Sequence, residues 1–95
     1  MMVTVYVNWE SHEILTKEQF KKEVEGLVEN IEEDEHEYDD RLYAFLEKKD
    51  LDVIDLFYMS ETDKLALRKE FEEWLVGDAE EQLLHEEYDE VKLEL

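Results

Sequence analysis

A capped amphipathic helix near the start of the chain is the feature that most constrains the fold. Five apolar residues recur there at spacings of four, three, one and three, the periodicity of a helix with one buried face. They are Phe20, Val24, Leu27, Val28 and Ile31. Thr16 stands just before them and Gln19 follows it by three residues, which is the pattern of a capping box. We therefore predict a helix over residues 17–33 that buries one face against another part of the chain.

The polar face of this helix carries its charges in an unusual order. Lysines come first, at positions 17, 21 and 22, and acids gather toward the end. The amino end of a helix is partially positive and its carboxyl end partially negative, so this order opposes the helix dipole. A chain optimised only for stability would have the reverse order.

The first residues of the chain show the two-residue periodicity of a β-strand. Residues 3, 5, 7 and 9 are Val, Val, Val and Trp and alternate with Thr, Tyr and Asn, which predicts a half-buried strand. Residues 13–15 are a candidate return strand, with a hairpin turn at residues 10–12. His12 suits this turn because it tolerates a positive φ better than most non-glycine residues.

The last residues of the chain allow two interpretations. Residues 91, 93 and 95 are apolar and alternate with charged residues, as in a strand. Leu84 and Tyr88 also align with Val91 and Leu95 at helical spacing, so this segment could instead extend a helix. We favour the strand, because a hairpin alone is marginal in water and a third strand would complete a small sheet.

Potential caps divide the middle of the chain into further helices. The acidic run at residues 32–40 is predicted to be a connector, after which Asp39 or Asp40 caps a second helix that ends near Lys48. Asp50 is expected to cap a short apolar helix that ends near Met59, with an irregular apolar segment as the alternative.

Two further helices are predicted after this short one. Ser60, with Asp63 three residues later, indicates where the first of them begins. Gly77 fits the C′ position at which that helix would stop. Asp78 can then cap a last helix that runs to about Tyr88.

Together these elements predict one α+β domain that spans residues 1–95. A small antiparallel sheet, made of the N-terminal hairpin and a C-terminal strand, would pack against three to five helices. The chain is 43% hydrophobic and 12% aromatic, which is enough apolar material for a core despite the charge. Trp9 and Trp74 stand at strand or helix spacing and are assigned to that core.

Residues that usually carry catalysis or hold metals are scarce or scattered. There is no cysteine, so disulfides and thiolate metal sites are excluded. His36 lies among acids that lack the spacing of a calcium-binding loop, and we interpret it as a solvated side chain. With only two glycines, no phosphate-binding loop of the usual form can be built. We expect no enzymatic activity, no cofactor and no metal site.

The net charge of −20, from 30 acids and 10 bases, is the main guide to function. Nucleic acids and anionic membranes would repel such a chain, whereas a basic groove built for nucleic acid would attract it. Small domains need a net charge of only about 2–8 for solubility. Acids three or four residues apart on a helix share a face and approximate a row of phosphates.

The predicted partner-binding residues combine these acids with one tyrosine. Tyr38 lies inside the acidic run without an apolar neighbour in sequence, a setting typical of an exposed interface anchor. The full set is Glu29, Glu32, Glu33, Asp34, Glu35, Glu37, Tyr38, Asp39, Asp40, Glu70, Glu73, Glu80, Glu86, Glu87 and Glu90.

Residues 5–16, Val-Tyr-Val-Asn-Trp-Glu-Ser-His-Glu-Ile-Leu-Thr, resemble the opening hairpin of small proteins from phages and prophages of Gram-positive bacteria. In size, Glu-rich charge and lack of cysteine, the chain is similar to phage inhibitors that mimic DNA, including anti-CRISPR and anti-restriction proteins. The hairpin likeness covers about an eighth of the chain, and the second likeness is one of composition. The resemblance implies an inhibitory role but assigns no functional residue.

We therefore expect an inhibitor that binds a basic nucleic-acid-binding protein by DNA mimicry. Its partner would be a host defence nuclease such as a CRISPR effector or a restriction enzyme, which it would meet in the host cytoplasm. It would bind neither nucleic acid nor membrane directly, and both a monomer and a homodimer fit the sequence. The main alternative is an acidic adaptor or regulatory protein that docks on a basic partner without displacing nucleic acid. A further alternative is a charge that serves solubility alone.

Overall fold

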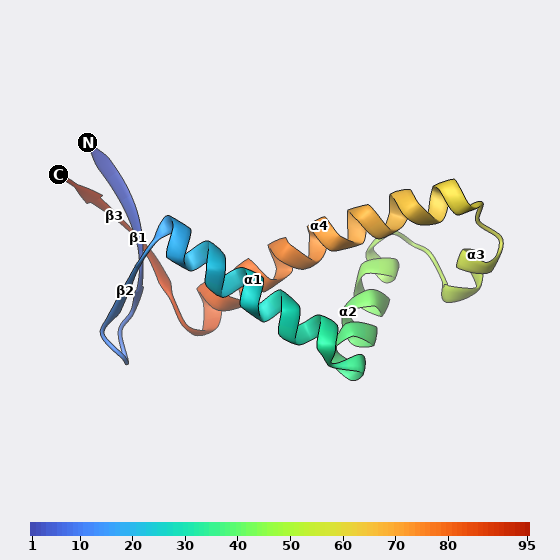
Figure 1. Cartoon of the computed structure of the whole chain (residues 1–95), viewed down its shortest axis with the longest axis horizontal. Coiled ribbons are helices and arrows are strands. Elements are labelled where there is room, and N and C mark those ends of the chain that lie inside the picture. Colours follow the sequence, from blue (N-terminus) through green and yellow to red (C-terminus); the bar gives the residue numbers. More distant parts are fainter.

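The computed structural model describes all 95 residues and contains three strands and four helices (Figure 1). In chain order the elements are β1 (Met2–Asn8), β2 (Glu13–Thr16), α1 (Lys17–Glu33), α2 (Glu35–Lys48), α3 (Val53–Phe57), α4 (Glu61–Glu86) and β3 (Asp89–Glu94). The sheet lies at one end of the molecule and α3 at the other, and α4 runs between them. This is the α+β architecture predicted from the sequence.

The three strands form an antiparallel sheet in the order β2-β1-β3, with β1 in the centre. Val5 of β1 lies opposite Thr16 on one side and opposite Val91 on the other. His12 in the hairpin turn has a φ of 60°. The predicted hairpin, its positive-φ residue and the C-terminal strand are confirmed, and the helical alternative for the last residues is wrong.

α1 has the bounds that its periodicity and cap predicted. The Thr16 hydroxyl oxygen accepts a hydrogen bond from the Gln19 N–H at 3.2 Å, and Gln19 Oε1 accepts one from the Thr16 N–H at 2.9 Å. Phe20, Val24 and Ile31 are buried, as their spacing predicted. The last turn contains no basic residue, so the charge order does oppose the helix dipole.

The acidic run does not form the predicted connector, because Asp34 alone separates α1 from α2. The prediction that Asp39 or Asp40 caps α2 is therefore wrong. Asp34 has an extended backbone, and its Oδ1 accepts hydrogen bonds from the N–H groups of His36 at 3.0 Å and Glu37 at 3.3 Å. The cap lies earlier than expected, and most of the run becomes helical.

The short helix after α2 also has a different cap. α2 ends at Lys48, close to the predicted end, but Asp50 adopts a positive φ of 57° and lies outside α3. Asp52 caps α3 instead, and its Oδ1 accepts from the Val53 N–H at 2.7 Å. The predicted short helix exists, but its predicted cap is wrong.

α4 is one continuous helix of 26 residues where two were predicted. Ser60 caps it as expected, since its hydroxyl oxygen accepts from the Asp63 N–H at 3.2 Å. The prediction that Gly77 stops a helix and Asp78 caps another is wrong. Gly77 has no positive φ, and Leu75 and Ala79 on either side of it are buried. Packing of these neighbours keeps the helix unbroken through the glycine.

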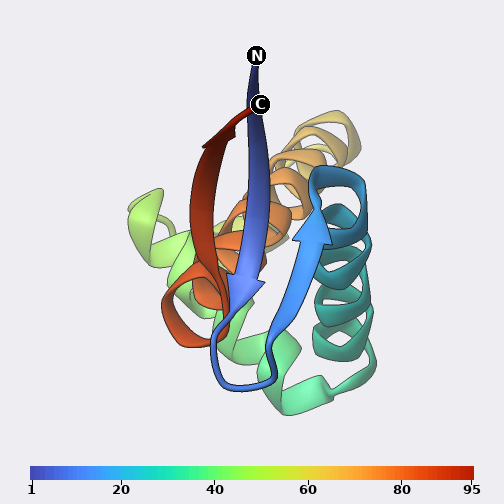
Figure 2. The same cartoon turned by 90° about the vertical axis from the view of Figure 1, so that its left-hand side faces the viewer.

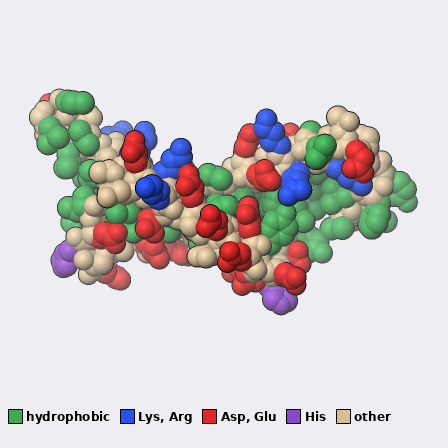
Figure 3. All heavy atoms as spheres, viewed as in Figure 1, with side chains coloured by type: hydrophobic (Ala, Val, Ile, Leu, Met, Phe, Trp, Pro, Cys, Tyr) green, Lys and Arg blue, Asp and Glu red, His purple; other side chains and the backbone are tan.

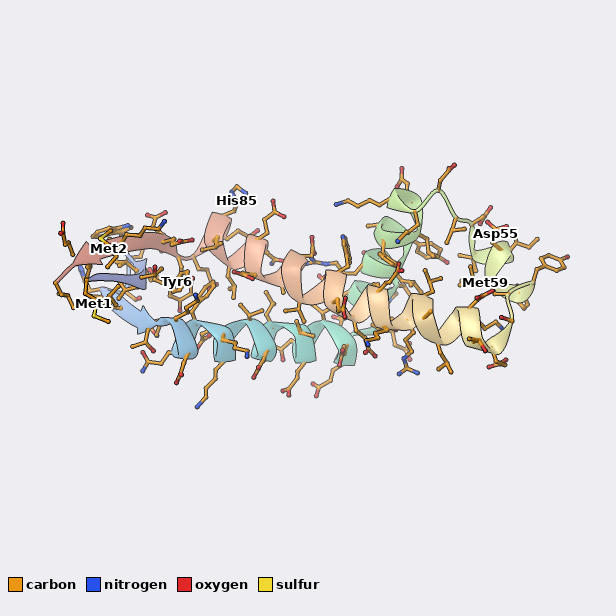
Figure 4. The ribbon with its side chains drawn as sticks, turned by 90° about the horizontal axis from the view of Figure 1, so that it is seen from above. Met1, Met2, Tyr6, Asp55, Met59 and His85 are labelled. Atoms are coloured by element: carbon orange, nitrogen blue, oxygen red, sulfur yellow. The ribbon has the colours of Figure 1, made fainter.

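The interior consists of two apolar clusters that α1 joins. The sheet-side cluster contains Tyr6, Leu15, Phe20, Val24, Ala79, Leu83 and Tyr88. The α2-side cluster contains Ile31, Phe45, Phe71 and Leu75. Leu27 and Val28 of α1 pack against both clusters. Within the sheet-side cluster, the rings of Tyr6 and Phe20 stack with their centroids 3.9 Å apart. This contact fixes the sheet on α1, and Figure 4 labels Tyr6.

The sheet is covered on one face only, as Figure 2 shows. Tyr6 and Leu15 lie opposite each other on β1 and β2 and belong to the sheet-side cluster. Side chains alternate along a strand, so Val3, Val5 and Val7 belong to the other face. No helix packs on that face, where Val7 is nevertheless buried and Val3 and Val5 are half-buried.

The two tryptophans differ in burial. Trp9 lies beyond the end of β1 and is 65% exposed, so its assignment to the core is wrong. Its indole N–H donates to Asp89 Oδ2 at 2.6 Å, which ties the hairpin turn to the start of β3. Trp74 was also assigned to the core. It is half-buried and packs against the α2-side cluster.

The molecule is elongated, with principal extents of 54 × 28 × 20 Å. Its radius of gyration is 16.6 Å, against roughly 12 Å for a compact domain of this length. The extension arises because α4 continues past the two clusters to α3, none of whose residues is buried. None of the helices has both the length and the apolar composition needed to cross a membrane.

Replacing Gly77 with Ala tests the continuity of α4. A Cβ at this position meets no atom within 4 Å, and the backbone is helical. The substitution should therefore raise the free energy of unfolding by about 0.5–1 kcal/mol, measured by urea denaturation. Gly26→Ala in α1 is the matched control and should have the same sign. A glycine that ended the helix with a positive φ would instead make Gly77→Ala destabilising.

Candidate acidic interface

Asp34 holds together the two helix ends that carry most of the predicted site. Its N–H donates to the Asn30 carbonyl oxygen at the end of α1, at 3.2 Å, while its carboxylate caps α2. With one residue between them, the last turn of α1 and the first turns of α2 share a corner (Figure 1). The sequence forms this corner because aspartate is among the best N-cap residues.

Eight carboxylates gather at this junction, which we call the acidic corner. They belong to Glu29, Glu32, Glu33, Asp34, Glu35, Glu37, Asp39 and Asp40, and all eight residues are exposed. Residues 23–40 contain ten acids and neither lysine nor arginine. The corner is the part of the predicted site that the fold brings together.

Lysine side chains lie away from the corner, and Arg41, which contacts Glu37, is the base beside it. In Figure 3 the Lys and Arg side chains gather near the start of α1 and toward the α3 end, and acidic side chains occupy the region around the corner. The sequence positions agree, because no base lies between Lys22 and Arg41. Screening of the corner by neighbouring lysines is therefore weak.

The predicted residues on α4 lie in several different environments. Glu70 is ion-paired with Lys49 at 2.5 Å, whereas Glu73 is exposed. Glu80 lines a shallow hollow together with Lys17 and Lys21 of α1. Glu70 and Glu80 thus have basic neighbours and are not part of the acidic corner.

The last three predicted acids lie at the sheet end. Glu86 and Glu87 line a hollow beside the hairpin turn, where Glu10, Glu13 and Asp89 add further carboxylates. Glu90 is on β3, opposite Tyr6. These residues form a second acidic region at the opposite end of α4 from α3, so the predicted site divides into separate groups.

Tyr38 is not the exposed anchor that its sequence context suggested. It is half-buried, and its ring meets that of Phe71 edge to face with the centroids 5.5 Å apart. This contact attaches the first turn of α2 to α4. The neighbours of Tyr38 in sequence are charged, but its neighbours in space are apolar.

Arg41 positions the acidic corner and was not singled out from the sequence. Its guanidinium donates hydrogen bonds to Asp78 and to Gln82 of α4, and Glu37 lies 3.8 Å away. The Arg41 side chain is 20% exposed, so these bonds are largely shielded from water. A lone base placed four residues after Glu37, directly after the acidic run, was the available signal.

The fold shifts the ionisation of Tyr6 and of Tyr88. Burial raises the pKa of Tyr6 above its ordinary value near 10, and the negative charges of Glu90 and Glu80 raise it further. Burial raises the pKa of Tyr88 in the same direction, again helped by nearby glutamates. No group of three or more His, Asp or Glu side chains is arranged to hold a metal ion.

Comparison with protein-family models, with curated protein sequences and with solved structures gave no match to this chain.

Arg41→Met tests whether the hydrogen bonds from Arg41 to Asp78 and Gln82 hold α2 on α4. The variant leaves Asp78 half-buried without its ionic partner, so the free energy of unfolding should fall by about 1–2 kcal/mol. Arg68→Met is the matched control, because it removes the same charge from an exposed ion pair with Glu72. That change should cost less than about 0.5 kcal/mol in urea denaturation. Equal effects of the two substitutions would show that Arg41 has no special role.

The raised tyrosine pKa values predict a loss of stability in alkali. Between pH 10 and the raised native pKa, Tyr6 is ionised in the unfolded chain but protonated in the fold. The unfolded state then holds fewer protons, so the free energy of unfolding falls as the pH rises above about 10. Tyr6→Phe should lessen this fall in thermal denaturation at pH 9 to 11. Tyr58→Phe, at a side chain that is 85% exposed, should leave it unchanged.

Proposed function

We propose that this protein is an inhibitor of the phage or mobile-element type that binds a basic nucleic-acid-binding protein. Its acidic corner takes the place of nucleic-acid phosphates in the partner's groove. A CRISPR effector or a restriction nuclease is the class of partner that this chemistry fits, since such proteins hold nucleic acid in positively charged grooves.

The observation that carries the proposal is the concentration of exposed carboxylates at the acidic corner, of which only Glu37 has an ionic partner. Eight exposed acids lie on two helix ends that Asp34 joins, with no lysine or arginine between residues 22 and 41. Along α1, Glu25, Glu29 and Glu33 follow one another at intervals of four residues, which corresponds to about 6 Å of helix axis. A strand of duplex DNA carries one charge per roughly 3.4 Å, so the corner offers a similar but sparser row.

The energetics favour a cationic partner. At the end of α1 the acids face the partial negative charge of the helix carboxyl end and one another, and both effects are unfavourable. A basic groove that binds the corner relieves this repulsion while it releases its own bound anions. Association should be steered electrostatically and should weaken as salt is added.

An adaptor that docks on a basic partner without displacing nucleic acid is the second candidate. The lysines at positions 17, 21 and 22 favour it, because they interrupt the acidic row at the start of α1. The acidic surface is then limited to a patch at one corner. A patch of this size suits docking on the rim of a groove as well as insertion into it.

A charge reversal at the corner tests the proposal. Glu33→Lys should raise the dissociation constant for the captured partner at least tenfold, which corresponds to about 1.4 kcal/mol. The variant should not unfold the protein, because a base in the last turn of α1 favours the helix dipole and raises stability by about 0.3–1 kcal/mol. Glu61→Lys is the control, since it makes the same charge change at an exposed side chain far from the corner.

The assay uses basic nucleic-acid-binding proteins that are retained on the immobilised chain and then purified. Each is bound to its fluorescently labelled nucleic acid, and the anisotropy is followed as the chain is added. An inhibitor of the proposed kind releases the labelled nucleic acid, whereas an adaptor forms a larger ternary complex. If Glu33→Lys and Glu61→Lys bind as the unchanged chain does, the acidic corner is not the interface.

A further inference from the structure

At the α3 end of the molecule, some apolar side chains face the rest of the protein and others face solvent. Val53 and Leu56 of α3 are half-buried toward the rest of the protein. Ile54, Phe57 and the following Tyr58 share the other side and are 57%, 79% and 85% exposed. In a small domain, apolar residues of a helix normally face the core, so those of α3 that face away are left without a partner. In Figure 4 the side chains of this segment, near the labelled Asp55 and Met59, extend away from the body of the molecule.

An apolar groove lies beside these exposed side chains. It has a volume of about 210 Å³ and is lined mainly by apolar side chains of α2 and α4, with Leu56 of α3 at its end. The lining includes Leu42, Phe45, Leu67 and Phe71. Figure 3 shows the same region as a hollow with hydrophobic side chains that continues to the tip of the molecule.

The charge around this apolar surface differs from that of the rest of the chain. Residues 48–71 contain five of the ten bases and only six of the 30 acids, so their net charge is −1. The remaining residues therefore carry −19 of the total charge of −20. Lys64 and Arg68 lie directly at the groove. Another copy of this acidic chain can approach here without strong repulsion.

We infer that the α3 end is the surface through which two copies of this chain associate. Ile54, Phe57 and Tyr58 of each copy pack across a two-fold axis, against the same residues and the groove beside them. A two-fold interface uses one surface patch twice and needs that patch to complement itself. A nearly neutral apolar patch meets this requirement, whereas an acidic patch does not.

The exposed aromatic side chains supply part of the area that such an interface needs. With roughly 200 Å² for a large aromatic side chain, the exposed fractions of Phe57 and Tyr58 correspond to roughly 300 Å². The largest apolar patch on an ordinary monomer is about 300–600 Å² and is often functional. Ile54 and the groove add to the patch on each copy, and standard interfaces bury about 800 Å² per partner.

The uncovered face of the sheet is the competing surface. Ile14, opposite Val7, is 65% exposed there, and Leu93, opposite Val3, is 43% exposed. Asp89, also opposite Val7, places a carboxylate at the hairpin end of this face. Substitution of Ile14 separates this surface from the α3 end.

Analytical ultracentrifugation of the full chain over a range of concentrations tests the inference. The unchanged protein should reach the mass of a dimer as its concentration rises. The double variant Phe57→Ser, Tyr58→Ser should raise the dimer dissociation constant at least tenfold. Because both side chains are exposed in the single copy, its circular dichroism and the sedimentation of its monomer should remain those of the folded chain.

Ile14→Ser is the control, since it removes an apolar side chain that is 65% exposed from the uncovered sheet face. It should leave the dimer dissociation constant unchanged. The inference is overturned if the unchanged chain stays monomeric up to about millimolar concentration, or forms assemblies larger than a dimer. It is also overturned if Ile14→Ser weakens the dimer as much as the double variant does.

Discussion

Packing of α1 against α4 is the interaction on which the rest of the structure depends. Leu27 and Val28 of α1 contact both apolar clusters, so one helix face joins the two parts of the interior. The sheet attaches to this pair of helices through Tyr6, and α2 attaches through Phe45. α2, with 14 residues, is marginal as an isolated helix, and Tyr6 and Leu15 of the sheet belong to the cluster formed with α1 and α4. Loosening the contact between α1 and α4 would therefore detach both and separate the acidic corner from its support.

The same packing determines where the negative charge lies. With one face of α1 buried on α4, its acids are confined to the outward side and to the last turn. Each like-charged pair one turn apart costs about 0.2–0.5 kcal/mol, so a handful of pairs costs about 1–2 kcal/mol. A small domain is stabilised by only about 5–15 kcal/mol, which makes this cost a substantial fraction. Arg41, the base nearest the corner, bonds to Asp78 and Gln82 and pairs with only one acid of the corner, Glu37.

Elements could be predicted from the sequence where a cap and a periodicity agree, as at Thr16 with Gln19 and at Ser60 with Asp63. The predictions failed where the deciding contact is remote in sequence. Several aspartates in the acidic run can cap a helix, and only the end of α1 selects Asp34. A helical glycine costs about 1 kcal/mol, and burial of Leu75 and Ala79 outweighs that cost at Gly77. The acidic residues of the site could be identified from the sequence by their charge. Which of them lie close together could not, because that depends on the contacts of Asp34 and Arg41.

The separation between the acidic corner and the α3 end allows each to act independently. α2 begins at the corner and ends beside α3, and its 14 residues span roughly 20 Å. At physiological ionic strength the Debye length is about 8 Å, so the potential of the corner is strongly screened at the other end of this helix. Salt therefore acts mainly on contacts at the corner, where charges meet, and little on contacts of Phe57 and Tyr58, where apolar area is removed from water. Two surfaces of opposite physical character can thus coexist on 95 residues, because eight residues, or about 12 Å of helix, still separate Asp40 from the end of α2.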